Sequence, residues 1–287
     1  MTRRSILGLV PALLQASNPE LPDLQSVPPD LVIPPVAPGP AAPGKRVRLT
    51  LPDYQGTEVH HLLYLPPDWS PRKRWPVIVE YAGNGNYRNE FGDVSDGSVE
   101  GSRLGFGASG GKGFLWLCLP FVNQRDGVNQ ALWWGDVEAT VAYCRRAVAS
   151  VCREFGGDPR AVILAGFSRG AIACNYIGLH DDSIAGLWRA FIPYSHYDGV
   201  RTTWPYPAAD RDSALARLQR LQGRPVFLCQ EVTVEPSRSY LEATGLAGSF
   251  TFQPVGFRNH NDAWVLRDVP ERRALRSWLA RVLRSPR

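Results

Sequence analysis

Residues 161–170 read AVILAGFSRG, an apolar run that ends in a serine placed between two glycines. An uninterrupted apolar run is typical of a strand buried on both faces of a parallel sheet. A helical pattern over residues 169–179 follows at once, so Ser168 lies at a sharp turn from strand to helix. Such a turn strains the serine backbone and exposes its hydroxyl, and the glycines let strand and helix approach closely. Ser168 is therefore a candidate nucleophile; the alternative is a turn serine with a structural role.

Strands and helices alternate along the remainder of the chain. We expect further strands at residues 45–51, 57–65, 77–81, 114–122, 190–195, 224–230 and 249–255. We expect further helices at residues 136–155, 212–222, 236–244 and 268–284. In the first of these, Val137, Val141 and Cys144 begin an apolar series spaced by threes and fours, which is helical periodicity. The alternation predicts an α/β protein with an open, mostly parallel sheet covered by helices on both faces.

Residues 87–113 interrupt this pattern with a stretch rich in Gly, Ser and Asp. A structureless connection of this length is uncommon in a compact domain and usually has a function. We therefore expect a functional loop here, with an insertion at residues 89–113 whose role the sequence does not define.

Composition excludes several classes of protein. Charged residues make up 21% of the chain and hydrophobic residues 44%, an ordinary balance for a globular protein. The net charge of +5 comes from scattered arginines without a basic cluster interleaved with aromatics, so we expect no nucleic-acid partner. The five cysteines lie in apolar strand or helix patterns, where a free cysteine packs as a small hydrophobe, and we expect them to be unpaired.

The first residues differ from the rest of the chain. Arg3 and Arg4 precede an apolar stretch at residues 6–14, the layout of an export signal over residues 1–17, and TRRSIL resembles the twin-arginine signature. The stretch is too short to span a bilayer, so we expect no stable membrane insertion. We therefore expect the protein to be exported, either to the periplasm or to the outside of the cell. The alternative is a disordered basic N-terminus on a cytoplasmic protein.

Residues 18–44 carry nine prolines and are expected to form a linker or a surface strap, followed by a single domain over residues 45–287.

Three stretches, YLPPDWSPRKRWPVIVEYAGNGN, GFSRG and NHNDAW, occur in the order and spacing of α/β-hydrolases. From about residue 45 the chain resembles this superfamily, and more narrowly the group that contains feruloyl and acetylxylan esterases, polyhydroxybutyrate depolymerases and prolyl-oligopeptidase-type catalytic domains. The resemblance implies the α/β-hydrolase fold and a serine esterase that works through a Ser-His-acid triad and an acyl-enzyme, without metal or cofactor. The chain departs from the pattern at Ala82-Gly83, where His-Gly is customary.

A serine hydroxyl needs a base that takes its proton. His260 lies in the polar loop GFRNHNDAW between the last strand and the terminal helix, where the order nucleophile, acid, histidine places the base. His60 and His61 lie on an early strand, where we expect one to face the core and the other to face solvent. His180 ends a helix, and His196 comes before any late acid.

The acid that orients the histidine should follow the preceding strand. Glu231 comes directly after that strand, whereas Glu235 precedes Pro236 and could simply cap the next helix. We favour Glu231, with Glu235 as the alternative and Asp198 as a third candidate. Asp262 is too close to His260 in the sequence to be the acid that orients it.

Two backbone N–H groups should bind the oxyanion, those of Arg169 after the nucleophile and Asn84 after the early strand. Residues near the expected strand ends are the candidates for substrate contact, with core packing as the alternative for the aromatic ones. They are Gly83, Trp133, Trp134, His196, Tyr197, Asp198 and Trp204. The side chains of Arg125 and Arg169 could bind an anionic substrate or pair with nearby carboxylates.

Hydrolysis of a small-molecule or polysaccharide-linked ester is the function that these features favour. A peptidase of the prolyl-oligopeptidase type is the enzymatic alternative, although the chain has no room for the large gating domain of that type. The third possibility is a noncatalytic binding module that retains the fold, which would require Ser168 or His260 to be misplaced.

Overall fold

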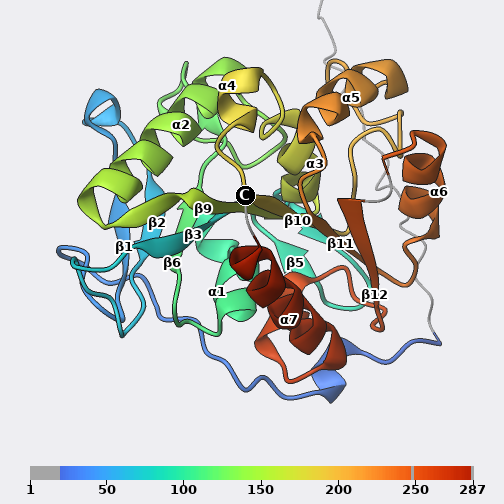
Figure 1. The fold of residues 1–287 in the computed structure, drawn as a ribbon, viewed down its shortest axis with the longest axis horizontal. Coiled ribbons are helices and arrows are strands. Elements are labelled where there is room, and N and C mark those ends of the chain that lie inside the picture. The colour runs from blue at the N-terminus through green and yellow to red at the C-terminus, as the bar shows by residue number, and fades with distance from the viewer. Residues whose placement is uncertain (1–19, 247–248, 286–287) are drawn as a thin grey trace, which may run out of the picture.

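The computed structural model describes residues 20–246 and 249–285, so the predicted export signal lies outside the described residues. An eight-stranded sheet forms the centre of the molecule (Figure 1). In spatial order its strands are β1 (Arg46–Leu49), β2 (His61–Tyr64), β6 (Leu115–Leu119), β3 (Trp75–Tyr81), β9 (Gly157–Phe167), β10 (Ala190–Tyr194), β11 (Val226–Glu231) and β12 (Phe250–Val255). β2 is antiparallel to both of its neighbours. The other strands of this sheet, β6, β3, β9, β10, β11 and β12, are parallel to one another. The predicted mostly parallel sheet is confirmed.

Helices cover both faces of the sheet, as predicted. On one face lie α2 (Val137–Glu154), α3 (Arg169–Tyr176), α4 (Asp182–Ala185), α5 (Arg211–Leu218) and α6 (Glu235–Ala243). The other face carries α1 (Leu104–Ser109) and α7 (Pro270–Arg284). Successive residues of β9 alternate between the two layers, because Leu164 packs on the α2 and α3 side and Ile163 on the α1 and α7 side. Among the described residues no helix is long and apolar enough to span a membrane.

Several helix boundaries follow from local signals that the sequence displays. Asp136 caps α2 by accepting a hydrogen bond from the Ala139 N–H, which starts the helix one residue after the predicted beginning. α3 is shorter than expected and ends at Tyr176. All five cysteines are free, as predicted, and four of them are buried.

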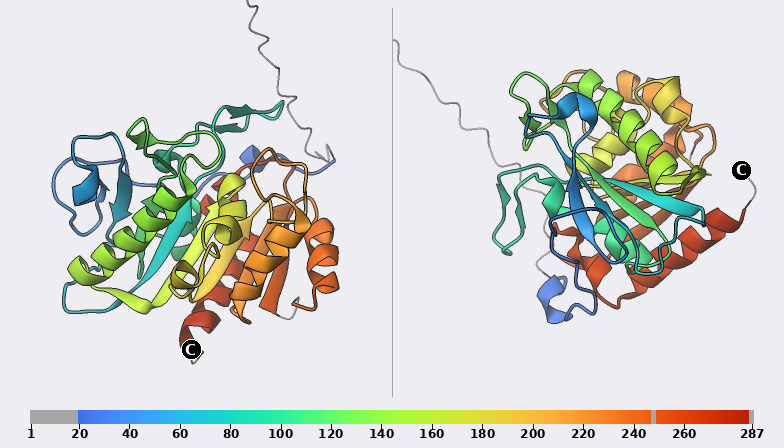
Figure 2. Two further views of the ribbon diagram at one scale, coloured as in Figure 1. Left: turned by 90° about the horizontal axis from the view of Figure 1, so that it is seen from above. Right: turned by 90° about the vertical axis from the view of Figure 1, so that its left-hand side faces the viewer.

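The stretch at residues 87–113 is not the plain loop that its composition predicts. It contains a hairpin of β4 (Tyr87–Arg88) and β5 (Val94–Ser95), a 3₁₀ turn η3 (Val99–Gly101) and helix α1. The hairpin projects from the body of the domain in Figure 2. α1 was missed because it has only six residues and two glycines, and tertiary contacts stabilise it. The two oxygens of the buried Glu80 accept hydrogen bonds from the N–H groups of Arg103, Leu104 and Gly105 at its beginning.

The proline-rich segment lies against the domain as a strap, on the side of α7 (Figure 1). The side chain of Leu24 is 3% exposed and packs in the α1 and α7 core. Asp30 forms two hydrogen bonds with Arg272 of α7, at 2.6 and 2.7 Å. The packed part of the chain therefore begins well before residue 45.

Candidate active site

The turn between β9 and α3 holds Ser168 in a strained backbone conformation, with φ 53° and ψ −111°. The two neighbouring glycines are required by space. A Cβ at Gly166 would overlap the carbonyl oxygen of Gly170, and one at Gly170 would overlap that of Tyr81. The Ser168 N–H donates to the Tyr194 carbonyl of β10 at 2.9 Å, which fixes the turn to the neighbouring strand. The sequence GFSRG thus has the geometry of a nucleophile elbow at the carboxyl ends of the strands.

The structure brings Ser168, His260 and Glu231 together from three segments of the chain. Ser168 Oγ lies 3.1 Å from His260 Nε2, and His260 Nδ1 lies 2.7 Å from Glu231 Oε1. All three residues are buried. Burial opposes ionisation of Glu231, but the charge of His260 and its hydrogen bond outweigh burial and lower the pKa of the Glu231 carboxyl.

The other acids considered for this role lie elsewhere. Glu235 begins α6 and pairs with Arg238 at 3.2 Å on the surface of that helix. Asp198 accepts two hydrogen bonds from Arg217, at 2.8 and 3.1 Å, in a buried ion pair. Asp262 pairs with Arg103 at 2.8 Å.

The histidines other than His260 have separate partners. His60 and His61 are both buried, so the expectation that one of them faces solvent is wrong. His61 Nδ1 lies 2.8 Å from the Tyr143 hydroxyl, and burial lowers its pKa to about 4. His180 pairs with Glu138 of α2 at 3.0 Å.

Ser195 joins the three residues, and sequence reasoning missed it. Its hydroxyl donates to Glu231 Oε1 at 2.8 Å and lies 3.0 Å from His260 Nδ1. Its φ of 90° is a costly conformation for a residue with a side chain, and its N–H donates to the Cys229 carbonyl at 2.8 Å. In the sequence Ser195 is only a residue at the end of a predicted strand, so nothing local marks it.

The predicted oxyanion donors are the backbone N–H groups of Arg169 and Asn84. Arg169 is the first residue of α3, so its N–H is one of those without an intrahelical acceptor. Asn84 follows β3 through Ala82 and Gly83, and its side-chain oxygen accepts a hydrogen bond from the Trp133 N–H at 2.7 Å. Within the described part of the chain, no backbone acceptor binds either the Asn84 or the Arg169 N–H.

The Arg169 side chain is not available to an anionic substrate. It is 1% exposed and donates to the carbonyls of Gln130, Ala131 and Trp133 at 2.7 to 3.2 Å and to that of Gly97 at 3.2 Å. Burial lowers its pKa to about 9, which still leaves the guanidinium charged at neutral pH. Arg169 therefore connects the loop at residues 130–133 and the loop at residue 97 to the beginning of α3.

Three of the predicted substrate-contacting residues form a series of ring contacts that reaches His260. The Trp133 and Trp204 rings lie 5.5 Å apart, the His196 ring lies 5.2 Å from Trp204, and the His196 ring lies 5.4 Å from His260. Burial, followed by the charge of His260, lowers the pKa of His196 to about 3, so its ring is neutral at pH 7. We refer to Trp133, Trp204 and His196 as the aromatic wall.

Three other substrate candidates point into the core instead. Trp134 is 4% exposed and packs against Tyr176 at 4.6 Å. The Tyr197 hydroxyl donates to Asn175 at 3.2 Å, and Asp198 is held by Arg217. Sequence position places these residues near the strand ends but does not reveal which way their side chains point.

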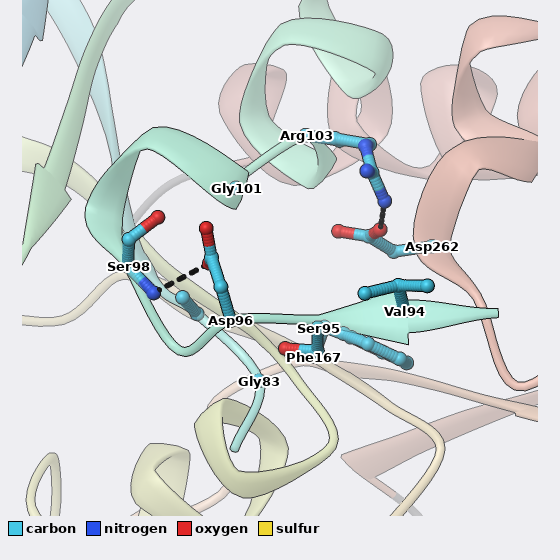
Figure 3. Close-up of a pocket in the computed structure, with 10 residues that line it drawn as sticks. Gly83, Val94, Ser95, Asp96, Ser98, Gly101, Arg103, Phe167 and Asp262 are labelled. Carbon is cyan, nitrogen blue, oxygen red and sulfur yellow. Dashed lines mark hydrogen bonds and ion pairs between the residues drawn. The ribbon is translucent and has the colours of Figure 1, made fainter. Parts of the chain in front are cut away.

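A pocket of about 230 Å³ lies beside the elbow (Figure 3). Gly83 and Phe167 form one side, and Asp96, Arg103 and Asp262 contribute charged groups on the other. A Cβ at Gly83 would lie 3.0 Å from the Phe167 ring, so a larger residue there would have to displace that ring by a few tenths of an ångström. Residues 20–246 and 249–285 hold no group of three or more His, Cys, Asp or Glu side chains arranged for a metal ion.

Comparison with known proteins gives a fold and no close relative. No protein-family model matches the chain, and no curated protein matches it. An esterase from Rhizomucor miehei superposes with a TM-score of 0.61 at 12% identity, over 88% of this chain and 85% of that one. A feruloyl esterase module from Clostridium thermocellum gives 0.52 at 13% identity, over 88% and 94%. Esterase 2 of Thermogutta terrifontis gives 0.52 at 20% identity, over 82% and 98%. Identities this low establish the fold alone, and on that ground, together with the sheet order and the elbow, the chain is an α/β-hydrolase-fold protein.

Proposed function

We propose that the protein is a serine hydrolase that cleaves carboxylic esters. The observation that carries the proposal is the continuous contact from Ser168 Oγ through the His260 ring to Glu231, at 3.1 and 2.7 Å. The esterase neighbours in fold support it. Binding without catalysis would not need a strained serine in contact with a histidine that a buried carboxylate orients.

The chemistry assigns one task to each group. His260 Nε2 takes the proton of Ser168 as Oγ attacks the ester carbonyl carbon, and the Asn84 and Arg169 N–H groups bind the oxyanion. His260 then passes the proton to the departing alcohol, which leaves an acyl-serine. Water loses a proton to His260, attacks the acyl carbon and releases the acid as the proton returns to Ser168. Glu231 holds the ring with Nδ1 protonated throughout.

The substrate that we propose is a small or polysaccharide-linked ester outside the cytoplasm. The aromatic wall of Trp133, Trp204 and His196 favours a substrate that has an apolar or aromatic group. Such a group would bind beside His260, where offset contacts with the rings would stabilise it. The extracytoplasmic location rests on the N-terminal sequence, whose arginines and apolar stretch have the layout of an export signal.

Initial rates on p-nitrophenyl acetate, butyrate and octanoate, measured with the full chain, test the proposal. Ser168→Ala and His260→Ala should each lower kcat/KM by about 10⁴-fold or more, because the triad acts as a unit. Ser183→Ala, in the first turn of α4, is the matched control and should keep the wild-type rate. A p-nitroanilide with the same acyl group separates the esterase from a peptidase. Turnover that survives Ser168→Ala, or faster cleavage of the anilide than of the ester, would contradict the proposal.

A further inference from the structure

Residues 256–267 carry His260, and we call this segment the histidine loop. Two segments that lie far from it in the sequence form hydrogen bonds with it. One is the hairpin of β4 and β5, and the other is the N-terminal strap. The triad itself explains neither set of contacts, because their hydrogen bonds are made to the backbone and the flanking side chains of the loop and not to the His260 imidazole.

Asp93, in the hairpin, is the centre of the first set. Its side chain is almost fully buried, and its Oδ2 accepts the His260 N–H at 2.9 Å. Its Oδ1 accepts the side-chain amides of Asn259 and Asn261, each at 3.1 Å. A fourth donor, Asn89 of the same hairpin, reaches Oδ2 at 2.8 Å. Three consecutive residues of the histidine loop therefore converge on one carboxylate.

Burial of such a carboxylate costs free energy, because its charge loses the hydration that water provides. A charge in the interior is tolerated only when it is fully paired by hydrogen bonds, and removal of its partners is strongly unfavourable. Four donors meet this requirement and also define the position of the Asp93 carboxylate relative to the loop. The Tyr87 ring, from the same hairpin, packs edge-on against the His260 ring with centroids 4.9 Å apart.

Asn259 connects this centre to the strap. While its side-chain nitrogen donates to Asp93, its Oδ1 accepts the Leu24 N–H at 2.7 Å. The neighbouring Arg258 donates its N–H to the Pro22 carbonyl at 3.2 Å and its guanidinium to Asp23 at 2.7 Å. An unbroken series of hydrogen bonds thus runs from the strap through Asn259 and Asp93 to the His260 backbone.

The strap also holds the far end of the same loop. The N–H groups of Asp30 and Leu31 both donate to the Leu266 carbonyl, at 3.0 and 3.2 Å. Arg267 donates to the Val27 carbonyl at 2.6 Å. The histidine loop therefore has hydrogen-bond partners in the strap at both of its ends and in Asp93 beside His260.

We propose that Asp93 and Asn259 are positioning residues that fix the backbone of His260 and make the N-terminal strap part of the active-site framework. This inference rests on the proposed serine hydrolase function. A displacement of about 1 Å in a catalytic group costs about 100-fold in rate, so loss of this series should act on turnover. The insertion and the strap, which the sequence shows only as irregular segments, would then share one role.

The test uses the full chain with Asp93→Asn and Asn259→Ala. Both should lower kcat on p-nitrophenyl butyrate by about 10- to 100-fold, with KM within about twofold, because the variants misplace the base without altering the substrate contacts. The rate of fluorophosphonate labelling of Ser168 should fall by a similar factor. Asp210→Ala is the matched control, because it removes the cap of α5 and lowers stability without touching the histidine loop.

A pair of substitutions at Leu24 tests the strap. Leu24→Pro removes the N–H group that donates to Asn259 Oδ1. A proline fits at this position, because Leu24 is the first residue of a 3₁₀ turn. The preceding residue, Asp23, has φ −72° and ψ 138°, which is a conformation that a residue before proline can adopt. Leu24→Ala shortens the same buried side chain and keeps the N–H. The proline variant should have a kcat about threefold or more below that of the alanine variant, since the two differ mainly in this hydrogen bond.

The outcomes separate this inference from the function on which it rests. Wild-type kcat in folded Asp93→Asn and Asn259→Ala proteins would overturn the inference and leave the triad untouched. An equal loss in Asp210→Ala would also overturn it, because the effect would then be one of stability. If Asp93→Asn does not fold, Asn259→Ala and the Leu24 pair decide. A wild-type protein that neither turns over nor labels would refute the proposed function itself.

Discussion

Replacement of Glu231 by Gln isolates the contribution of the carboxylate charge. Two donors, His260 Nδ1 at 2.7 Å and the Ser195 hydroxyl at 2.8 Å, converge on one oxygen of this side chain. If the amide oxygen takes that place, only the charge is lost, and a charge-assisted hydrogen bond becomes a neutral one. That change is worth about 1–2 kcal/mol, or about 5- to 30-fold in rate.

The amide nitrogen of Gln can instead face His260. The ring would then carry its proton on Nε2 and could not accept the proton of Ser168. The corresponding change in other Ser-His-Asp triads lowers kcat by about 10⁴, which is about 5.4 kcal/mol. Because Ser195 donates to the same oxygen, both placements compete, and we predict a fall in kcat/KM between these limits, at about 10- to 10⁴-fold.

Esterase kinetics on p-nitrophenyl butyrate at pH 8 provide the assay, with circular dichroism and thermal unfolding to establish that the variant folds. Glu235→Gln is the matched control, since its carboxylate pairs with Arg238 on the surface and should leave the rate within about twofold. A Glu231→Gln enzyme within about fivefold of wild type would refute the assignment of the acid. So would a large loss in Glu235→Gln.

Three further predictions concern groups around the triad and in the core. Ser195→Ala should lower kcat by about tenfold with little change in KM, measured in the same assay, because Glu231 loses the hydrogen bond that this hydroxyl donates at 2.8 Å; an unchanged kcat would show that the contact is incidental. Arg169→Met should lower the free energy of unfolding by about 2–4 kcal/mol in urea titrations, because carbonyls of two loops lose the donor that the buried guanidinium supplies; a loss below about 0.5 kcal/mol would contradict this role. His61 is neutral in the folded protein because burial lowers its pKa from 6.5 to about 4, so the unfolded state binds the extra proton between these pH values and stability falls as the pH falls through that window. The loss should approach roughly 3 kcal/mol from pH 7 to pH 4, and urea titrations of His61→Gln should show a correspondingly flatter dependence on pH.

The sequence was sufficient to predict the elements that local chemistry determines. The apolar run before Ser168, the glycines beside it and the cap at Asp136 are all local signals, and the elbow and α2 form where those signals place them. The mostly parallel direction of the strands followed from the alternation of strands and helices. Ser168, His260 and Glu231 could be proposed as a set because they follow the order nucleophile, acid, histidine of the fold that the chain resembles.

The sequence did not reveal groups whose role depends on contacts between distant segments. Asp93 lies 167 positions from His260 in the chain, and Leu24 lies 235 positions from Asn259. No spacing rule connects such pairs. The direction of a side chain was a second obstacle, since Trp133 lies on the aromatic wall while the adjacent Trp134 packs in the core.

Identification of the residue that a fluorophosphonate modifies tests the central claim most directly. The full-length protein is incubated with the reagent, its intact mass is measured, and the modified peptide is sequenced by mass spectrometry. The account predicts a single adduct on Ser168, which His260→Ala reduces by orders of magnitude because the hydroxyl then has no base to activate it. An unmodified protein, or an adduct on a different serine, would contradict the claim that Ser168 is the nucleophile.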